Sequence, residues 1–346
     1  MTGQQSELVV AGYYGFGNLG DEAIRVALRE ALAKRGIDTL WLTARPQTKD
    51  EIDRRSLLQL FTALRRSRAL VLGGGGLLQN RTSGRSLLYY LGLIGLARMA
   101  RRPVFLLGQG IGPIDGRVAR LLTRVALKGT SYIGCRDRGS VSFLRTLGLN
   151  AVIDGDLFFL LPPVEAPPIR SSLVRHIILC LKGAKDDAEM IEKIVHMLDE
   201  VSRETKISVT LLPFFPAQDL ALSEKIASRL NIPCRIVHAD SIDNTMHVLE
   251  RADLVISSRL HGLEFALRAG APMIAITEDQ KIDAFVAEVR ETSGLQIPCV
   301  RFASSEQVML VLESSPAFAI VNEAYLALHA RATEGFSRFV AALEEV

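Results

Sequence analysis

Short apolar runs alternate with amphipathic stretches along the whole chain of 346 residues. Such alternation favours parallel β-sheets that are covered by helices. In the first half, the apolar runs predict strands at 7–12, 38–43, 69–73, 103–107, 131–135 and 151–154. Helical spacing of apolar residues predicts helices between them at 21–34, 49–66, 83–101, 116–128 and 139–147. Together these elements make one complete doubly wound unit.

A second series of strands follows a proline-rich segment. Residues 161–168 hold four prolines in eight positions, which sustain neither a helix nor a central strand and predict a domain linker with a boundary near residue 165. Strands are then expected near 175–181, 207–213, 234–238, 253–257 and 272–276. The tail from 316 to 346 is one long amphipathic stretch, longer than a helix that covers a single sheet needs to be.

We therefore predict an α/β chain with two Rossmann-like doubly wound domains, at 1–165 and 166–318, and a C-terminal helix at 319–346 that crosses back onto the first domain. Two such domains facing a cleft are the arrangement called GT-B in glycosyltransferases. In this arrangement ligands lie at the carboxyl ends of both sheets. The GT-B assignment is a fold analogy.

Charge and composition exclude only a few classes of function. A net charge of +3, from 41 basic and 38 acidic residues, is too balanced for a dedicated nucleic-acid binder. The four cysteines are far apart and form no C-x-x-C pair, so we interpret them as buried reduced thiols. The chain starts without a secretory pattern, and its longest uncharged apolar run, 87–97, is shorter than the roughly 20 residues that span a bilayer. We expect a cytoplasmic protein that is either free or peripheral at the inner membrane face.

Three glycine-rich segments follow predicted strands in the first half, at 12–22, 73–76 and 108–113. A backbone without side chains lets N–H groups reach an anion, so the three segments indicate a site for a phosphorylated ligand. The first also matches the dinucleotide pattern G-x-G-x-x-G. The acid that should follow the second strand is replaced by Arg45, which disfavours NAD and leaves NADP as a minor alternative.

Several residues of these segments are candidate ligand contacts. Asn18 lies on a glycine-flanked loop, where its amide would bind a ligand rather than only form a turn. Asp21 and Glu22 would orient substrate hydroxyls, although an Asp at a helix start often serves only as a cap worth about 1 kcal/mol. The run Gly73–Gly76 either admits a ligand or only permits a tight turn, and Asn80 and Arg81 beside it favour ligand contact.

Two further clusters carry charge or proton-transfer groups. Arg136 and Arg138 follow the strand at 131–135, and guanidinium forks bind carboxylate or phosphate, although Arg136 with Asp137 would also fit an ordinary surface pair. Arg259 and His261 follow the strand at 253–257, and histidine is the side chain best suited to proton transfer near neutral pH. The remaining histidines show no ligand spacing, so we assign no metal site.

Taken together, the motifs at 12–22, 73–79, 108–113, 136–140 and 258–262 resemble the polysaccharide pyruvyltransferase family. This resemblance implies transfer of the enolpyruvyl group of phosphoenolpyruvate to two hydroxyls of a sugar, giving a pyruvate ketal and phosphate without a metal or other cofactor. For bacterial cell-wall members it implies an N-acetylmannosamine unit of a lipid-linked polymer precursor as acceptor. It also implies that Arg136, Arg259, His261 and Lys281 hold phosphoenolpyruvate.

The residues suggest roles in such a reaction. We hypothesise that His261 is the general acid, that Arg136 and Arg259 clamp carboxylate and phosphate, and that Asp21 or Glu22 is the base. Further substrate contacts are expected from Gly17, Asn18, Gly74, Gly75, Gly76, Gln109, Arg138 and Lys281. The assignment of Lys281 departs from the family pattern, because Thr277–Gln280 replaces the tyrosine and proline that often precede the family's lysine.

Alternative readings remain at this stage. A nucleotide-sugar glycosyltransferase with the same fold would bind a diphosphate in its second domain, and a non-catalytic sugar-binding protein would tolerate loss of Arg259 and His261. Segments 54–66 and 87–102 mix apolar and basic residues. They would either rest on an anionic membrane surface or pack on a sheet with basic outer faces.

Overall fold

The computed structural model describes residues 7–81, 83–165, 173–184, 187–277, 279–314 and 316–346. The chain divides into two compact units. The first comprises Met1–Phe16, Asp21–Leu161 and Leu328–Val346, and the second comprises Gly17–Gly20 and Pro162–Ala327. Each unit has its own parallel β-sheet and its own hydrophobic core.

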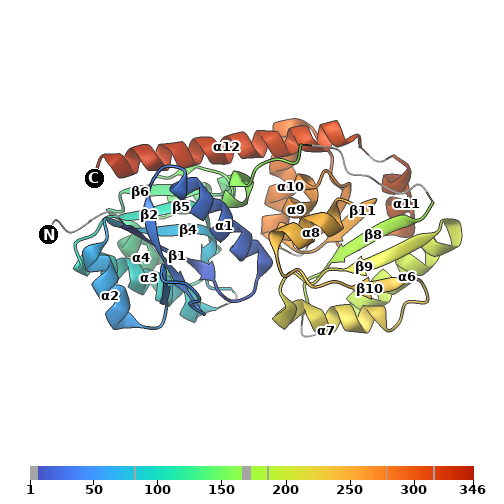
Figure 1. The fold of residues 1–346 in the computed structure, drawn as a ribbon, viewed down its shortest axis with the longest axis horizontal. Coiled ribbons are helices and arrows are strands. Elements are labelled where there is room, and N and C mark those ends of the chain that lie inside the picture. The colour runs from blue at the N-terminus through green and yellow to red at the C-terminus, as the bar shows by residue number, and fades with distance from the viewer. Residues whose placement is uncertain (1–6, 82, 166–172, 185–186, 278, 315) are drawn as a thin grey trace. The chain divides into compact units, whose positions relative to one another are not determined.

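The first unit is built on a seven-stranded sheet with the order β3-β2-β1-β4-β5-β6-β7, in which every neighbouring pair is parallel (Figure 1). Its strands are β1 (Glu7–Tyr14), β2 (Asp38–Thr43), β3 (Glu51–Asp53), β4 (Ala69–Leu78), β5 (Val104–Ile111), β6 (Tyr132–Cys135) and β7 (Val152–Ile153). The helices of this half are α1 (Leu19–Ala33), α2 (Leu57–Arg66), α3 (Gly84–Met99), α4 (Arg117–Leu127), α5 (Arg138–Thr146) and the short 3-10 helix η1 (Leu157–Leu160). The strand order is the doubly wound arrangement that the alternating pattern predicted.

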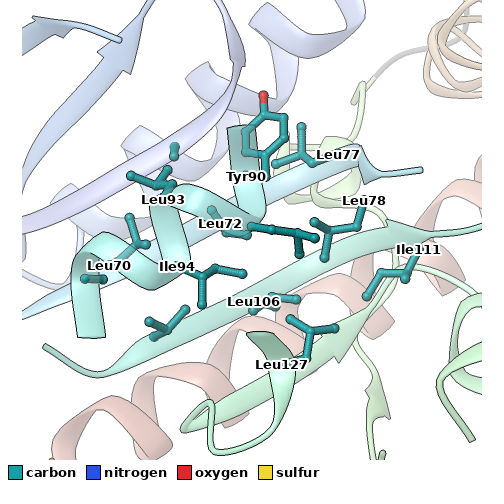
Figure 2. Close-up of a cluster of buried hydrophobic side chains, with 14 of the residues drawn as sticks. Leu70, Leu72, Leu77, Leu78, Tyr90, Leu93, Ile94, Leu106, Ile111 and Leu127 are labelled. Carbon is teal, nitrogen blue, oxygen red and sulfur yellow. The ribbon is translucent and has the colours of Figure 1, made fainter. Parts of the chain in front are cut away.

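One face of this sheet is covered by α2, α3, α4 and α5, whose apolar residues share a core with β4 and β5. Figure 2 shows the centre of this core, where Leu72 of β4 and Leu106 of β5 lie against Tyr90 and Ile94 of α3, all fully buried. Burying a side chain of this size contributes roughly 1.5–3 kcal/mol. Buried apolar residues recur along α3 from one helical turn to the next. Ser83 caps the start of the helix by accepting a hydrogen bond from the Ser86 N–H.

The second unit has a six-stranded parallel sheet with the order β10-β9-β8-β11-β12-β13. Its strands are β8 (Arg175–Cys180), β9 (Ile207–Leu211), β10 (Cys234–Ile236), β11 (Leu254–Ser257), β12 (Met273–Ile276) and β13 (Cys299–Val300). Its helices are α6 (Ala188–Glu204), α7 (Pro216–Ala227), α8 (Ile242–Leu249), α9 (Leu260–Arg268), α10 (Gln280–Ser293) and α11 (Ser305–Glu313). The same winding around β8 makes this a second Rossmann-like domain.

The long final helix, α12 (Phe318–Glu344), begins in the second unit and belongs to the first from Leu328 onward. There the ring of Phe339 packs edge-on against Phe105 of β5, with 5.6 Å between the ring centroids. Arg68 reaches the same helix and donates a hydrogen bond to the Leu343 carbonyl at 2.6 Å. The predicted return of the C-terminal helix to the first domain is therefore confirmed.

Two expectations about local structure were wrong, those for the ends of β4 and β5 and for the helix over 49–66. β4 and β5 do not end at residues 73 and 107 but continue through their glycines to Leu78 and Ile111. The helix expected over 49–66 begins only at Leu57, and its first part forms the short strand β3. The prolines of the predicted linker fall partly on 166–172, which lie outside the described residues.

Two simpler expectations can be compared directly. All four cysteines are free thiols; Cys135 and Cys180 are buried, which raises the pKa of both, while Cys234 and Cys299 are only half-buried. Among the helices in the described ranges, none combines the length and apolar character needed to cross a bilayer.

Candidate functional site

Each sheet has a point where the strand order reverses, between β1 and β4 in the first unit and between β8 and β11 in the second. Ligands of doubly wound sheets bind outside the carboxyl ends of the strands at this point. In the first unit the position is occupied by the glycine run after Leu72 and by the start of α1. Asp21 lies there with only 8% of its surface exposed, close enough to Gly75 that a Cβ on Gly75 would fall 3.2 Å from its Oδ1.

The glycine run is part of a buried strand rather than an open loop. A Cβ on Gly73 would fall 2.7 Å from a methyl of Leu28, and a Cβ on Gly74 would fall 2.8 Å from a methyl of Ile24. Gly74 and Gly75 also have φ near +75°, which side chains rarely adopt. Gly73 and Gly74 are therefore required for close packing of α1 on β4. Gly75, which lies beside Asp21, and Gly76 remain candidates for ligand contact.

The two acids at the start of α1 have different surroundings. Glu22 accepts a hydrogen bond from the Gly15 N–H at 2.6 Å and pairs with Arg25 at 3.0 Å, so it holds the loop that follows β1. Burial raises the pKa of the Tyr13 and Tyr14 phenols, and the nearby charge of Asp21 raises both further. Of the two acids considered as a base, Asp21 is the better candidate.

Arg136 is not a surface residue. It is 7% exposed, and its guanidinium lies 3.3 Å from Asp137 and 3.4 Å from Asp156. A Cβ on Gly110 would fall 2.8 Å from its Nη2, so the glycine in β5 makes room for the guanidinium. The surface-pair alternative for Arg136 and Asp137 is therefore wrong, because the guanidinium is buried and is held by two carboxylates.

The neighbours of Arg136 are positioned by helix α5. Asp137 caps this helix by accepting hydrogen bonds from the N–H of Ser140 at 2.7 Å and from its hydroxyl at 2.9 Å. Arg138 is the first residue of the helix and is exposed. Arg136 and Arg138 thus differ in their surroundings, because one is buried in a carboxylate pair and the other faces solvent.

Gln109 of β5 is fully buried. Its amide donates hydrogen bonds to the carbonyls of Leu72 at 3.0 Å and Gly74 at 2.9 Å, which brace β4 where its register shifts. The backbone carbonyl of Gln109 accepts a hydrogen bond from the backbone N–H of Arg136 at 3.0 Å. Gln109 is therefore placed to position the glycine run and Arg136, not to touch a substrate itself.

The first unit also contains a cluster that the sequence did not suggest. The guanidinium of Arg54 lies 4.2 Å from the ring centroid of Tyr89 and 4.9 Å from that of Phe16, which in turn stacks on Tyr13. Burial raises the pKa of Tyr89 and Tyr13. Cation–π contacts bring together residues 35 or more positions apart, and no short motif records such a contact.

In the second unit the carboxyl ends of β8 and β11 are joined by serine hydroxyls. The Ser257 hydroxyl donates to the carbonyl of Cys180 at 3.1 Å, and that of Ser258 accepts the Lys182 N–H at 2.8 Å. A Cβ on Gly262 would fall 2.4 Å from the Ser257 oxygen, so glycine is needed for α9 to approach β11 closely. The serines and the glycine in the segment 257–262 therefore fix the position of the backbone that carries Arg259 and His261.

Arg259 is fixed by an acid from a distant part of the sequence. Its Nε donates to Oδ2 of Asp219 at 3.0 Å, its Nη2 donates to Oδ1 of the same residue, and Nη2 also reaches Gln218 at 2.8 Å. Asp219 is fully buried and also accepts the N–H groups of Gly183 and Phe215. The bonds of Nε and Nη2 hold the guanidinium in place. Within the described ranges Nη1 of Arg259 has no hydrogen-bond acceptor, so its N–H groups are available to an anion.

His261 lies in the first turn of α9 with 16% of its side chain exposed. Its Nε2 is 3.8 Å from an oxygen of Glu264, one helical turn further on and 1% exposed. When the imidazole carries a proton, this carboxylate forms an ion pair with it, because residues at i and i+3 share a helix face. Glu264 lies two residues after the motif at 258–262, and the sequence analysis assigned it no role.

The remaining candidates of the second unit lie at turns. The side-chain oxygen Oδ1 of Asn18 accepts the Gly20 N–H at 3.2 Å and so caps α1, and Gly17 before it is exposed with φ +78°. Lys281 is the second residue of α10 and half-buried, and its backbone N–H is bound by the cap residue Asp279. Asp21, Gln109, Arg136 and Arg138 thus belong to the first unit, and Gly17, Asn18, Arg259, His261 and Lys281 to the second.

Comparisons of the whole fold give distant matches. A protein of Listeria monocytogenes described as a UDP-N-acetylglucosamine 2-epimerase matches with a TM-score of 0.66 and 12% identity, over 98% of this chain and 97% of that one. The UDP-N-acetylglucosamine 2-epimerase of Neisseria meningitidis matches with a TM-score of 0.61 and 11% identity, over 97% and 99%. MurG of Acinetobacter baumannii matches with a TM-score of 0.52 and 13% identity, over 99% and 100%. At these identities the matches establish the GT-B type of fold and nothing about chemistry.

Sequence comparison is more specific. A search of curated proteins finds no match. A family model for polysaccharide pyruvyl transferase matches residues 18–280, which is more than half of the chain and contains Arg136, Arg259 and His261. This protein belongs to the polysaccharide pyruvyl transferase family, and it is a transferase enzyme that acts on a saccharide acceptor.

Proposed function

We propose that the enzyme uses phosphoenolpyruvate as its donor and joins the enolpyruvyl group to two hydroxyls of one sugar. In this reaction C3 of the donor gains a proton and becomes a methyl group, while C2 forms two C–O bonds and loses its bond to the phosphate oxygen. Each sugar hydroxyl releases a proton, and phosphate leaves. No metal and no cofactor other than this co-substrate are part of the proposal.

The observation that supports the donor best is the fixed guanidinium of Arg259 two residues before His261. A clamp that is already ordered binds a carboxylate or phosphate without a further loss of side-chain freedom. Arg259 holds the donor anion, and His261 then delivers the proton to C3. The buried Glu264 stabilises the protonated imidazole by charge attraction and keeps it ready to donate.

Further groups come from both units, with Asp21, Arg136 and Arg138 in the first and Gly17, Asn18 and Lys281 in the second. Arg136, held by Asp137 and Asp156, is a second guanidinium for the donor, with Arg138 and Lys281 as further positive charges. Asp21 accepts a proton from a sugar hydroxyl, and Gly75, Gly76, Gly17 and the Asn18 amide line the acceptor. Gln109 positions these groups through its hydrogen bonds to β4 and to the backbone of Arg136.

We propose an N-acetylmannosamine unit of a lipid-linked cell-wall polymer precursor as acceptor, following the family resemblance of the motifs. The test incubates the purified full chain with phosphoenolpyruvate and with aryl glycosides of N-acetylmannosamine, N-acetylglucosamine and N-acetylgalactosamine. We expect phosphate release that depends on the manno compound and a product with the mass of its pyruvate ketal.

Other outcomes of this assay separate the alternatives. Phosphate release with another hexosamine would keep the donor and replace the acceptor. The absence of any acceptor-dependent turnover, together with micromolar binding of UDP in calorimetry, would instead favour a nucleotide-sugar glycosyltransferase, which the GT-B fold also accommodates.

A further inference from the structure

The outer surface of α2, α3 and α4 is unusually apolar. These helices leave eight large hydrophobic side chains exposed by 44% to 79%: Leu57, Leu58, Leu88, Met99, Val118, Leu121, Leu122 and Val125. On α4 four of them follow the spacing i, i+3, i+4 and i+7. Thr123 and Leu127, the buried residues of that helix, lie on the opposite side. α4 thus has two apolar faces, of which one packs on the sheet and the other faces outward.

The charge of the same region is strongly one-sided. Residues 56–135 contain twelve arginines and lysines and a single acid, Asp115. Because the whole chain carries +3, this stretch of +11 is balanced by −8 on the rest of the molecule. None of α2, α3 and α4 contains an acidic residue. The mild net charge of the protein therefore hides a basic region beside an acidic remainder.

The three helices form one continuous surface. They cover the same face of the first sheet, since α2, α3 and α4 share one core with β4 and β5. Neighbouring helices are also joined directly, because Arg98 of α3 donates hydrogen bonds to the carbonyls of Val125, at 3.1 Å, and Lys128 at the end of α4. Figure 1 shows α2, α3 and α4 together on the side of the sheet opposite α1. The exposed apolar and basic side chains are therefore neighbours in space.

We propose that this α2–α3–α4 surface lies on an anionic lipid bilayer and places the enzyme at a membrane. Apolar side chains of α4 insert into the boundary of the acyl chains, and arginines such as Arg117 and Arg124 at the edge of the apolar stripe bind lipid phosphates while their stems stay in contact with the apolar layer. Each basic residue near such a surface contributes about 1 kcal/mol. The inference does not depend on the proposed reaction, because membrane binding needs no substrate.

The combination of features decides the kind of partner. A nucleic acid would be attracted by the arginines but gains nothing from exposed leucines and valines. A second copy of this chain would bring a like-charged surface to the same face, which costs free energy. A bilayer containing anionic lipids satisfies both features at once, with hydrocarbon for the apolar stripe and phosphates for its basic edge.

The test measures co-sedimentation of the full chain with vesicles of phosphatidylcholine alone and with vesicles containing phosphatidylglycerol. We expect binding to the anionic vesicles that weakens as salt rises, since screening weakens surface charge interactions. Arg117→Gln with Arg124→Gln, which remove two charges that form no ion pair with any described residue, should weaken binding roughly thirtyfold. Leu121→Gln with Val125→Gln should also weaken it, at unchanged charge.

A control variant carries one apolar and one basic substitution on the second unit, Leu310→Gln with Arg203→Gln, both at exposed positions. This variant should bind like the unchanged protein. The proposal is overturned if the control loses as much binding as the α4 variants, or if the unchanged protein does not bind anionic vesicles. Retained vesicle binding in the apolar variant would mean a purely electrostatic surface. A dimer that dissociates in that variant would mean a second copy as partner. Either result would also overturn the proposal.

Discussion

Arg259 and Asp219 form a two-point ion pair in which both carboxylate oxygens accept from one guanidinium. The acid is 40 residues earlier in the sequence, and its oxygens also bind two backbone N–H groups, so it joins three segments of the second unit. An arginine that is held in this way keeps its plane fixed before any ligand arrives. The pair therefore connects the stability of the second unit to the binding of the donor anion that we propose for Arg259.

Asp219→Asn tests this relationship. The neutral amide keeps its shape but loses a charge-assisted hydrogen bond, so we expect KM for phosphoenolpyruvate to rise roughly tenfold with a smaller change in kcat. Urea denaturation should show a loss on the order of 3 kcal/mol, because a buried ion pair is broken. Ser223→Ala is the control, since its hydroxyl bonds within α7 and does not contact Arg259. Equal kinetics in both variants would contradict the positioning role.

Glu264→Gln tests the role of His261 as the general acid. Without the carboxylate 3.8 Å from Nε2, the protonated imidazole is less stable. We expect the fall of kcat/KM with rising pH to begin at lower pH, while activity on the acidic side changes little. The exposed Glu313→Gln serves as control. An unshifted profile in Glu264→Gln would remove the carboxylate from proton transfer, and full activity in His261→Ala would remove the acid itself.

Gly110→Ala tests the position of Arg136. A methyl group at this position would fall 2.8 Å from Nη2 and 3.0 Å from Cζ of Arg136, so the guanidinium must move from its two carboxylates. We expect KM for phosphoenolpyruvate to rise about tenfold or more, since small displacements of a binding group are costly. Gly92→Ala, which has open space around its added carbon, should leave KM unchanged and stabilise the protein by roughly 0.5–1 kcal/mol.

Asp154→Asn tests a pH effect on stability. Burial raises the pKa of Asp154 from 3.8 to about 6, although its hydrogen bond from Tyr132 and the charge of Arg338 act in the other direction. Between these two pH values the folded state binds more protons than the unfolded state, so this carboxyl's contribution to stability is present at low pH and is lost as pH rises through 6. The full loss is on the order of 3 kcal/mol.

The measurement compares urea unfolding of the protein and the Asn variant between pH 4 and 7. Because asparagine does not titrate, the free energy of unfolding of the unchanged protein should decline relative to that of the variant across this range. Parallel curves would show that Asp154 titrates at its ordinary value and that the contacts of Tyr132 and Arg338 offset its burial.

Much of the fold was predictable because it follows from the periodicity of apolar residues. The misses have identifiable causes. Glu51–Asp53 is a strand of three half-buried residues, held to α1 by ion pairs of Glu51 with Arg25 and Arg29, so it has no apolar signal. β4 and β5 were expected to end at glycines. The sequence cannot reveal that Leu28 and Ile24 of α1 pack where side chains of Gly73 and Gly74 in β4 would be, or that Leu157 packs where a side chain of Gly108 in β5 would be.

The candidate site was predictable to a similar extent. Residue type and position at strand ends pointed to Arg136, Arg259 and His261, because these are local features of the sequence. Their partners were not predictable: Asp219 and Asp156 become neighbours of the arginines only through the fold. The supporting role of Gln109 depends likewise on carbonyls of another strand.

The division of α12 between the two units has a consequence for synthesis of the protein on the ribosome. Phe339 and other buried residues after Leu328 complete the core of the first unit, whose sheet has been translated long before. The apolar surface that awaits Phe339, around Phe105 and Tyr132, must therefore stay uncovered while the entire second unit emerges. A nascent chain of this enzyme would therefore expose that surface until α12 is made, and truncation within α12 would damage the domain that was made first.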